Sequence, residues 1–95
     1  MKKIFVYGTL VAATCRDRVM GEREDREIEV VTLDGYRKEG LNIIKDLSSS
    51  VKGVTFWVNE DEERLLDFYE HYPILYKKIT VKPEGGVAFA YQLTS

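Results

Sequence analysis

The 95-residue sequence predicts one α+β domain in which a mixed, barrel-like β-sheet packs with two main helices. The first observation is the order of the patterns, since β-forming runs and helical segments follow one another as β-α-β-β-β-α-β-β with short connections. The second is composition, because 44% of the residues are hydrophobic, which is enough for one core. The third is length, which leaves little chain for a second domain.

The first strand is expected at residues 3–7, KIFVY, an apolar run of β-forming residues. Thr9 is expected to cap a helix over residues 11–20, and Gly21 is expected to end it. The charged residues 16–18 are expected to lie mostly outside the apolar side of that helix.

Three further strands are expected before the second helix, over residues 28–36, 41–44 and 51–58. Asp34-Gly35 introduces a bend or bulge into the first of them, and the serines at 48–50 are expected to form a loop before the last. Gly53 lies inside a predicted strand, which indicates a bulge or a close approach of another backbone.

Asn59 is expected to begin the second helix, because Asn59 and Glu62 have the spacing of a capping box. Pro73 is expected to end it. The apolar side of this helix is expected to contain Leu65, Leu66, Phe68, Tyr69 and Tyr72. Two last strands are expected over residues 76–81 and 87–93, joined by a hairpin turn at 83–86.

Charge excludes several classes of partner. Fourteen Lys and Arg against sixteen Asp and Glu give a net charge of -2, so no overall field favours nucleic acid or an anionic membrane. Ten of the charges lie within residues 16–29, which are expected to be a surface segment with ion pairs. Lys77, Lys78 and Lys82 are expected to form a solvated strand edge rather than a nucleic-acid surface.

The protein is expected in the cytoplasm. Cys15 is the only cysteine, so no intrachain disulfide can form and a reducing compartment fits. No apolar run approaches the roughly 18 residues of a membrane span. Residues 1–14 have the basic start and apolar stretch of a signal peptide, but Tyr7-Gly8-Thr9 interrupts the run and no cleavage site follows. We therefore expect these residues to belong to the fold.

Metal and cofactor sites lack their usual signatures. One histidine, one cysteine and the acids of a helix start do not provide metal ligands at a credible spacing. Gly85-Gly86 belongs to a predicted hairpin rather than to a phosphate-binding loop. No serine has the context of a nucleophile elbow. The sequence therefore predicts a function without a metal or a cofactor.

Tyr7-Gly8-Thr9-Leu10 is the first candidate site, at a predicted strand-to-helix junction. The N–H groups at a helix N-terminus are unpaired and carry partial positive charge, so they suit a carboxylate or a phosphate. Gly8 would let a ligand approach the backbone closely. The alternative is an ordinary tight turn capped by Thr9.

Glu70 is the second candidate, in the last turn of the second predicted helix and at the margin of its apolar side. The negative end of the helix and apolar neighbours such as Leu66 both disfavour a charged carboxylate, so both are expected to raise its pKa. A more basic carboxylate suits a general base. The alternative is a surface glutamate paired to a lysine.

Several motifs resemble the γ-glutamylcyclotransferase-like superfamily, above all its AIG2-like branch, over nearly the whole chain. Phe5-Val6-Tyr7-Gly8-Thr9-Leu10 resembles the family motif FVYGTL. Two shorter segments also resemble family motifs: Arg18-Val19-Met20-Gly21 is similar to R-V-L-G, and Leu33-Asp34-Gly35-Tyr36-Arg37 is similar to L-x-G-Y-R. A longer late motif, L-D-x-x-E-G-Y-P-x-x-Y-x-R, resembles Leu66-Asp67-Phe68-Tyr69-Glu70-His71-Tyr72-Pro73 followed by Tyr76-Lys77-Lys78. The opening motif joined to a late L-D-x-x-E is a specific combination.

The resemblance implies the γ-glutamylcyclotransferase-like fold and a transferase (acyltransferase) reaction that needs no cofactor. In that reaction a small γ-glutamyl compound, either a γ-glutamyl amine or a γ-glutamyl amino acid, cyclises to 5-oxoproline and releases the amine. The resemblance implies that Glu70 is the catalytic acid and base. It also implies that the substrate is bound by Tyr7, Gly8, Thr9, Leu10, Tyr76 and Lys78.

Several positions differ from the family pattern, and Leu41-Asn42-Ile43-Ile44 is a poor match to its proline-containing strand. His71 replaces the glycine that usually follows the catalytic glutamate, Lys78 replaces an arginine, and Ala12-Ala13 replaces Asp-Pro. These differences, in a chain that is short for the family, leave a second hypothesis open. It is a module of the same fold that binds small carboxylates or a protein without turnover.

Overall fold

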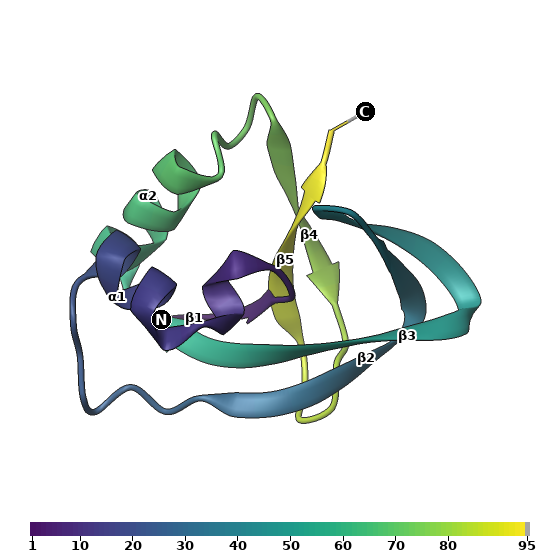
Figure 1. Ribbon diagram of the computed structural model, residues 1–95, viewed down its shortest axis with the longest axis horizontal. Helices are drawn as coiled ribbons and strands as arrows, with labels where there is room; N and C mark the ends of the chain where they lie inside the picture. Colours follow the sequence, from purple (N-terminus) through teal and green to yellow (C-terminus); the bar gives the residue numbers. More distant parts are fainter. Residues whose placement is uncertain (95) are drawn as a thin grey trace.

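The computed structural model describes residues 1–94 (Figure 1). Its elements are β1 Lys2–Val6, the 3-10 helix η1 Thr9–Val11, α1 Ala13–Met20, β2 Glu29–Glu39, β3 Asn42–Val58, α2 Glu60–Tyr69, β4 Tyr76–Val81 and β5 Ala88–Leu93. The five strands form one sheet in the order β2-β3-β1-β5-β4, which confirms the predicted α+β class. None of the helices within the described residues is long and apolar enough to cross a membrane.

The sheet is mixed and strongly curved, as Figure 1 shows. β1 pairs in parallel with β5 and antiparallel with β3, and the other two pairs are antiparallel. The start of β3 reaches the end of β5, where Leu93 N–H donates to Asn42 Oδ1 at 2.9 Å. At the other edge, Thr32 N–H donates to the Glu84 carboxylate at 2.8 Å, which joins β2 to the β4–β5 turn. These contacts bend the sheet into the predicted barrel-like shape.

β1 contributes to two apolar clusters, because successive side chains of a strand face opposite sides. Ile4 and Val6 pack in the cluster that contains Leu66 of α2, whereas Phe5 packs in the cluster formed by strand residues. The crowding around β1 explains Gly53 of β3. A Cβ atom there would lie 2.2 Å from Val6 O and 2.8 Å from Phe5 Cζ, so the predicted close backbone approach is confirmed.

The start of the first helix differs from the prediction. Residues 9–11 form η1, and α1 begins only at Ala13, without a side-chain N-cap. Thr9 is therefore not an N-cap, because its hydroxyl forms a hydrogen bond with Tyr69 Oη at 2.9 Å. The predicted end of the helix is confirmed at Gly21, which has a φ of 89°.

Arg16 contradicts the expectation that the charged residues of the first helix lie outside its buried side. It is 8% exposed, and its Nη1 donates to Leu10 O at 3.0 Å and to Val11 O at 2.6 Å. Its guanidinium also lies 5.9 Å from the centre of the Phe56 ring. The core accommodates this arginine because its N–H groups satisfy carbonyls at the end of η1.

β3 is one continuous strand, so the serines at 48–50 are not the predicted loop. The β2–β3 register shifts between Asp34 and Tyr36, which confirms the predicted bulge. Across from it, the Asp46 carboxylate accepts hydrogen bonds from Ser48 N–H at 3.1 Å and from the Ser48 and Ser49 hydroxyls at 2.8 and 3.0 Å. These bonds provide hydrogen-bond partners for polar groups of β3 at the bulge, where the regular pairing with β2 is interrupted.

The capping box of α2 is confirmed, since Glu62 N–H donates to Asn59 Oδ1 at 2.8 Å and Asn59 N–H donates to Glu62 Oε1 at 3.0 Å. The helix ends at Tyr69, before Pro73, and Glu70 is its C-cap residue. Its predicted apolar side is only partly buried. Leu66 is fully buried, whereas the exposed members are Leu65, Phe68, Tyr69 and Tyr72.

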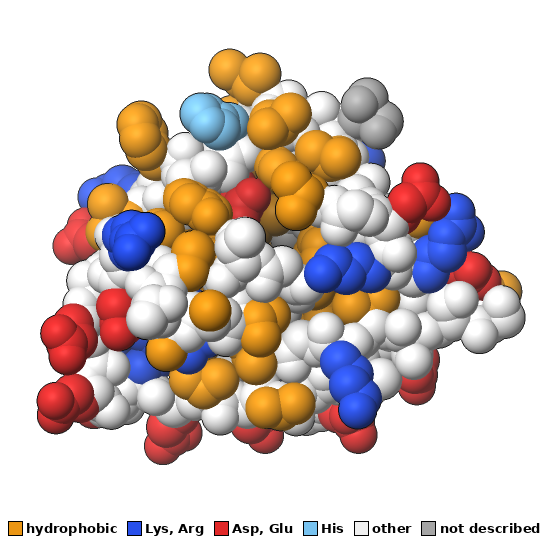
Figure 2. Space-filling model, in the orientation of Figure 1, with side chains coloured by type: hydrophobic (Ala, Val, Ile, Leu, Met, Phe, Trp, Pro, Cys, Tyr) orange, Lys and Arg blue, Asp and Glu red, His pale blue; other side chains and the backbone are white. Residues whose placement is uncertain are grey.

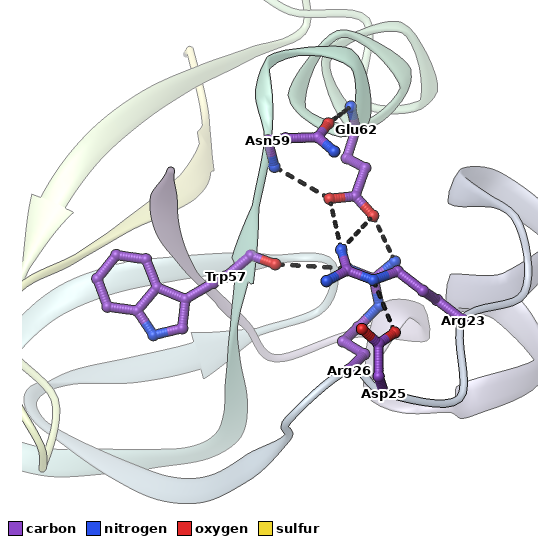
Figure 3. A network of polar contacts seen from close by, with 6 residues as sticks. All are labelled: Arg23, Asp25, Arg26, Trp57, Asn59 and Glu62. Carbon is purple, nitrogen blue, oxygen red and sulfur yellow. Dashed lines mark hydrogen bonds and ion pairs between the residues drawn. The ribbon is translucent and has the colours of Figure 1, made fainter.

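The charged segment at residues 16–29 is not wholly a solvated surface. In Figure 3 the Glu62 carboxylate faces Arg23 and Arg26, with Arg26 Nη2 at 2.6 Å and Arg23 Nη1 at 3.2 Å. The Arg26 side chain is 5% exposed and that of Glu62 is 9% exposed. Arg26 therefore joins the segment after α1 to the first turn of α2 through a largely buried ion pair, and Arg23, whose side chain is 36% exposed, adds a second one.

Candidate active site

A cavity of about 350 Å³ opens where the end of β1, η1, the end of α2 and the strands β4 and β5 meet. Its walls are formed by Phe5, Val6, Tyr7, Gly8, Thr9, Leu10, Leu41, Tyr69, Glu70, Leu75, Tyr76 and Tyr91. The fold thus brings the turn at residues 7–10 and Glu70, which are far apart in the sequence, into the wall of one cavity.

The turn at residues 7–10 leads from β1 into η1 rather than directly into an α-helix. It is held by Arg16, which donates to the Leu10 carbonyl, and by Tyr69, whose hydroxyl bonds the Thr9 hydroxyl. The Gly8 carbonyl accepts from Val11 N–H at 3.1 Å. In contrast, the N–H groups of Gly8, Thr9 and Leu10 donate no hydrogen bond within the described part of the chain. These N–H groups are therefore available as donors, and the residues that carry them line the cavity.

Glu70 is held at the end of α2, where its N–H donates to Leu66 O at 2.9 Å. Burial raises the pKa of its carboxyl group above the ordinary value of 4.5, which is the predicted direction. Neither an ion pair nor a hydrogen bond from residues 1–94 offsets that effect. The alternative of a surface glutamate paired to a lysine is therefore wrong.

The cavity wall near Glu70 contains the phenol groups of Tyr7, Tyr69, Tyr76 and Tyr91. Each hydroxyl has a partner in the protein: Tyr7 donates to Tyr91 O, Tyr76 to Leu41 O at 2.7 Å and Tyr91 to Asp67 Oδ1 at 2.6 Å, while Tyr69 bonds Thr9. Burial and then the negative charge of Glu70 raise the pKa of Tyr76. The pKa values of all four phenols are raised above the ordinary value of 10.0. Among the described residues that line the cavity, Glu70 is the one with a carboxyl group.

Lys78 lies away from the predicted substrate-binding position. Its ammonium group bonds Glu63 Oε2 at 2.6 Å and Asp67 Oδ1 at 3.0 Å, and it lies 4.4 Å from the centre of the Tyr72 ring. Two acids of α2 thus hold the lysine in a largely buried ion pair, in which the Lys78 side chain is 13% exposed. The structure brings Tyr76 to the cavity as predicted, but it does not bring Lys78 there.

Sequence reasoning missed two residues that shape the site. Tyr91 lines the cavity, binds Tyr7 through its carbonyl oxygen and binds Asp67 through its hydroxyl. Arg16 fixes the end of η1 by donating hydrogen bonds to the Leu10 and Val11 carbonyls. For Tyr91, the only sequence signal of a role in the site was a tyrosine in an otherwise apolar predicted strand. For Arg16 there was no such signal, because it lies in a run of charged residues that was expected to be exposed.

The described residues contain no group of three or more His, Cys, Asp or Glu side chains arranged to hold a metal ion. The site consists instead of one carboxylate, backbone N–H groups, phenols and aliphatic side chains. Such a set can bind an anion at one point and exchange a proton at another.

The fold occurs in several solved structures. A solution structure from Arabidopsis thaliana has a TM-score of 0.79 and 22% identity, with 99% of this chain and 69% of that one covered. A structure named gamma-glutamyl cyclotransferase has a TM-score of 0.71 and 16% identity, with 99% and 67% covered. The crystal structure of an AIG2-like protein from Mus musculus has a TM-score of 0.67 and 20% identity, with 99% and 78% covered. At these identities the likeness shows the fold.

Comparison with curated protein sequences gives no significant match. A family model, described as gamma-glutamyl cyclotransferase, AIG2-like, matches residues 4–94, so both the opening motif and the segment around Glu70 lie inside the match. The chain therefore belongs to the AIG2-like gamma-glutamyl cyclotransferase family.

Proposed function

We propose that the protein converts a γ-glutamyl compound to 5-oxoproline, with Glu70 as the general acid and base. The observation that carries this proposal is the convergence of two features on one cavity. One is a carboxyl group whose pKa is raised by burial, and the other is a set of unpartnered N–H groups at residues 8–10 within the described chain. A γ-glutamyl head carries the complementary pair, an ammonium group and a carboxylate on the same carbon.

In the proposed complex, the N–H groups of residues 8–10 bind the α-carboxylate of the γ-glutamyl head. Preorganised backbone donors stabilise an oxyanion without a side-chain cation. The space in front of Gly8 supports this, since a Cβ atom there would have nothing within 4 Å. Tyr7 and Tyr76 form the adjoining wall. Because Lys78 is bound to Glu63 and Asp67, no direct contact with substrate is proposed for it.

Glu70 then removes a proton from the α-ammonium group, and the free amine attacks the γ-carbonyl carbon to close a five-membered ring. The bond from that carbon to the leaving nitrogen breaks as the proton held by Glu70 passes to that nitrogen. The ring nitrogen still carries one proton too many, and Glu70, again a carboxylate, accepts it and passes it to the released amine. The products are 5-oxoproline, as its carboxylate, and the protonated amine, so atoms and charges balance without another reactant. A raised pKa suits both transfers because it makes the carboxylate a stronger base. Holding the substrate folded supplies the proximity that ring closure needs.

The test is the release of 5-oxoproline, measured by mass spectrometry, from a panel of γ-glutamyl amines and γ-glutamyl amino acids. Glu70→Gln is expected to lower kcat at least about 100-fold, which is the lower range for loss of a general acid or base. Glu60→Gln is the matched control, because this acid of the same helix is 91% exposed and is not part of the site. Its kcat is expected to stay within about twofold of the parent value.

Two results would change the proposal. Unchanged turnover in Glu70→Gln would contradict the role of Glu70. Binding of small carboxylates at residues 8–10 without product from any compound of the panel would favour the binding module without turnover.

We also infer that the partner is a small molecule in the cytoplasm rather than a nucleic acid or a membrane. A net charge of -2 supports this, since no overall field attracts an anionic polymer or surface. The lone Cys15 supports a reducing compartment. Cell fractionation tests the compartment directly.

A further inference from the structure

The two halves of the proposed site come from separate elements. Residues 8–10 lie at the start of η1, whereas Glu70 is the C-cap residue of α2. In Figure 2 hydrophobic side chains gather beside the histidine, which follows Glu70 in the chain, and around a hollow with acidic atoms in it. Because ring closure requires the base close to the bound substrate, the position of Glu70 relative to residues 8–10 has to be fixed.

One hydrogen bond joins these halves directly. The Tyr69 hydroxyl oxygen lies 2.9 Å from Thr9 Oγ1, and either group can donate. Tyr69 is the last residue of α2 and directly precedes Glu70, and both Tyr69 and Thr9 line the cavity. No other hydrogen bond or ion pair within residues 1–94 connects residues 7–10 with α2 or with Glu70.

The exposure of Tyr69 limits what this bond contributes to stability. Tyr69 is 39% exposed, and the thiol of Cys15 in α1 lies 3.6 Å from the same phenol oxygen. Water can replace a lost partner at such a site, so the net gain in stability from the hydrogen bond is small. The main consequence of the bond is therefore geometric, because it fixes the end of α2 against the start of η1.

We propose that Tyr69 is a positioning residue of this site, whose hydroxyl holds Glu70 in place relative to the N–H groups of residues 8–10 by binding Thr9. Tyr69 transfers no proton itself and acts through the two residues beside it in space and in sequence. A displacement of about 1 Å between reacting groups can lower a rate about 100-fold, so loss of the bond lowers turnover more than binding. This inference rests on the proposed function, because it uses the roles proposed there for Glu70 and residues 8–10.

The experiment compares turnover with binding in Tyr69→Phe, which removes only the hydroxyl. For the γ-glutamyl compound that the parent protein converts fastest, kcat is expected to fall at least about fivefold. 5-Oxoproline carries the carboxylate but no ammonium group, so it probes the binding of residues 8–10 alone. Its dissociation constant, measured by NMR titration, is expected to stay within about twofold of the parent value. A smaller fall in kcat, or an equal loss of affinity for 5-oxoproline, would overturn the inference.

Tyr72→Phe is the matched control, because Tyr72 is also 39% exposed but lies outside the cavity wall. Its kcat is expected to stay within about twofold of the parent value, and both variants are expected to keep Tm within about 4 °C of it. Thr9→Val removes the other hydroxyl of the bond. The double variant Tyr69→Phe/Thr9→Val is expected to have a kcat within about twofold of the slower single variant. Multiplied losses would show that the two hydroxyls act separately, which would overturn the inference.

Failure of this inference can be distinguished from failure of the proposed function. Turnover by the parent protein with an unaffected Tyr69→Phe would overturn the inference and leave the function intact. If the parent protein gives no 5-oxoproline from any compound, NMR order parameters of the N–H groups of residues 8–10 replace kcat. A fall from about 0.85 toward about 0.6 in Tyr69→Phe but not in Tyr72→Phe then supports the positioning of residues 8–10 while the cyclisation fails. Equal order parameters in the two variants would overturn both.

Discussion

Asp67 holds the ammonium group of Lys78 at 3.0 Å, one helical turn before Glu70 on the same chain segment. The same carboxylate accepts a hydrogen bond from Tyr91 Oη at 2.6 Å. Asp67 is therefore paired, whereas burial raises the pKa of Glu70 and no cation within residues 1–94 lowers it. Two carboxylates in different surroundings can serve different purposes, and the proposed function assigns proton exchange to Glu70 alone.

The pairing of Asp67 with Lys78 is expected to be measurable as a coupling. Asp67→Asn should lower the free energy of unfolding by about 1–2 kcal/mol, because Lys78 and Tyr91 lose an ionised acceptor. In a double-mutant cycle with Lys78→Met, denaturant unfolding should give a coupling of at least about 0.5 kcal/mol. Additive effects of the two substitutions would show that the pair contributes no stability of its own.

The ion pair drawn in Figure 3 predicts acid sensitivity. Although burial raises the pKa of Glu62, hydrogen bonds from Asn59, Arg26 and Arg23 outweigh it and hold that pKa below the ordinary value of 4.5. The stability that Glu62 contributes is thus fully present above pH 4.5 and is lost as the pH falls through the lower pKa of the folded state.

Removing the Glu62 carboxylate leaves the buried Arg26 uncompensated. Glu62→Gln is expected to lower the free energy of unfolding at pH 7 by about 3 kcal/mol and to flatten its fall in acid. Denaturant unfolding between pH 3 and 7 measures both effects. The control is Glu60→Gln, where an exposed acid is changed and the loss should stay below about 0.5 kcal/mol.

His71 follows Glu70 with a φ of 55°, in the left-handed region that favours glycine. This explains why the family pattern has glycine at this position. His71→Gly is expected to raise the free energy of unfolding by about 1 kcal/mol, because the strain of a side chain with positive φ is relieved. His71→Ala retains a Cβ atom and should not share the gain. A loss of stability in His71→Gly would mean that contacts of the imidazole outweigh the strain.

Gly53 is predicted to tolerate no side chain. Because a Cβ atom would lie 2.2 Å from the Val6 carbonyl oxygen, Gly53→Ala requires the backbone of β1 or β3 to move. We expect it to lower the free energy of unfolding by more than about 2 kcal/mol. The neighbouring exposed residue offers a control, since Lys52→Ala should change stability by less than about 0.5 kcal/mol. A Gly53→Ala protein as stable as Lys52→Ala would contradict the close approach.

The features that sequence predicted correctly depend on residues close together in the chain. The capping box pairs Asn59 with Glu62, three positions later, and the raised pKa of Glu70 follows from its place at the margin of an apolar helix side. The convergence of Glu70 with residues 7–10 could be expected only from the family resemblance, because no local pattern links two distant segments.

Three of the errors share a physical cause, which is that groups outside the local sequence pattern compete for the same side chain. The Thr9 hydroxyl bonds Tyr69 instead of capping a helix, and Arg16 is buried because carbonyls at the end of η1 accept its N–H groups. Lys78 is withdrawn from the cavity by Glu63 and Asp67. In each case the hydrogen-bond or ion-pair partner lies on another element or turn. The periodicity of hydrophobic residues in the sequence does not indicate such contacts.

The pH dependence of kcat/KM for 5-oxoproline release tests the proposed role of Glu70 most directly. The proposed mechanism needs the base form of Glu70 in the free protein, so activity is expected to rise with pH through the pKa of this group. Because burial raises that pKa, the midpoint of the acid limb should lie above 4.5, and the limb should be absent from the residual activity of Glu70→Gln. A limb at or below 4.5, or the same limb in Glu70→Gln, would contradict the assignment of Glu70 as the base.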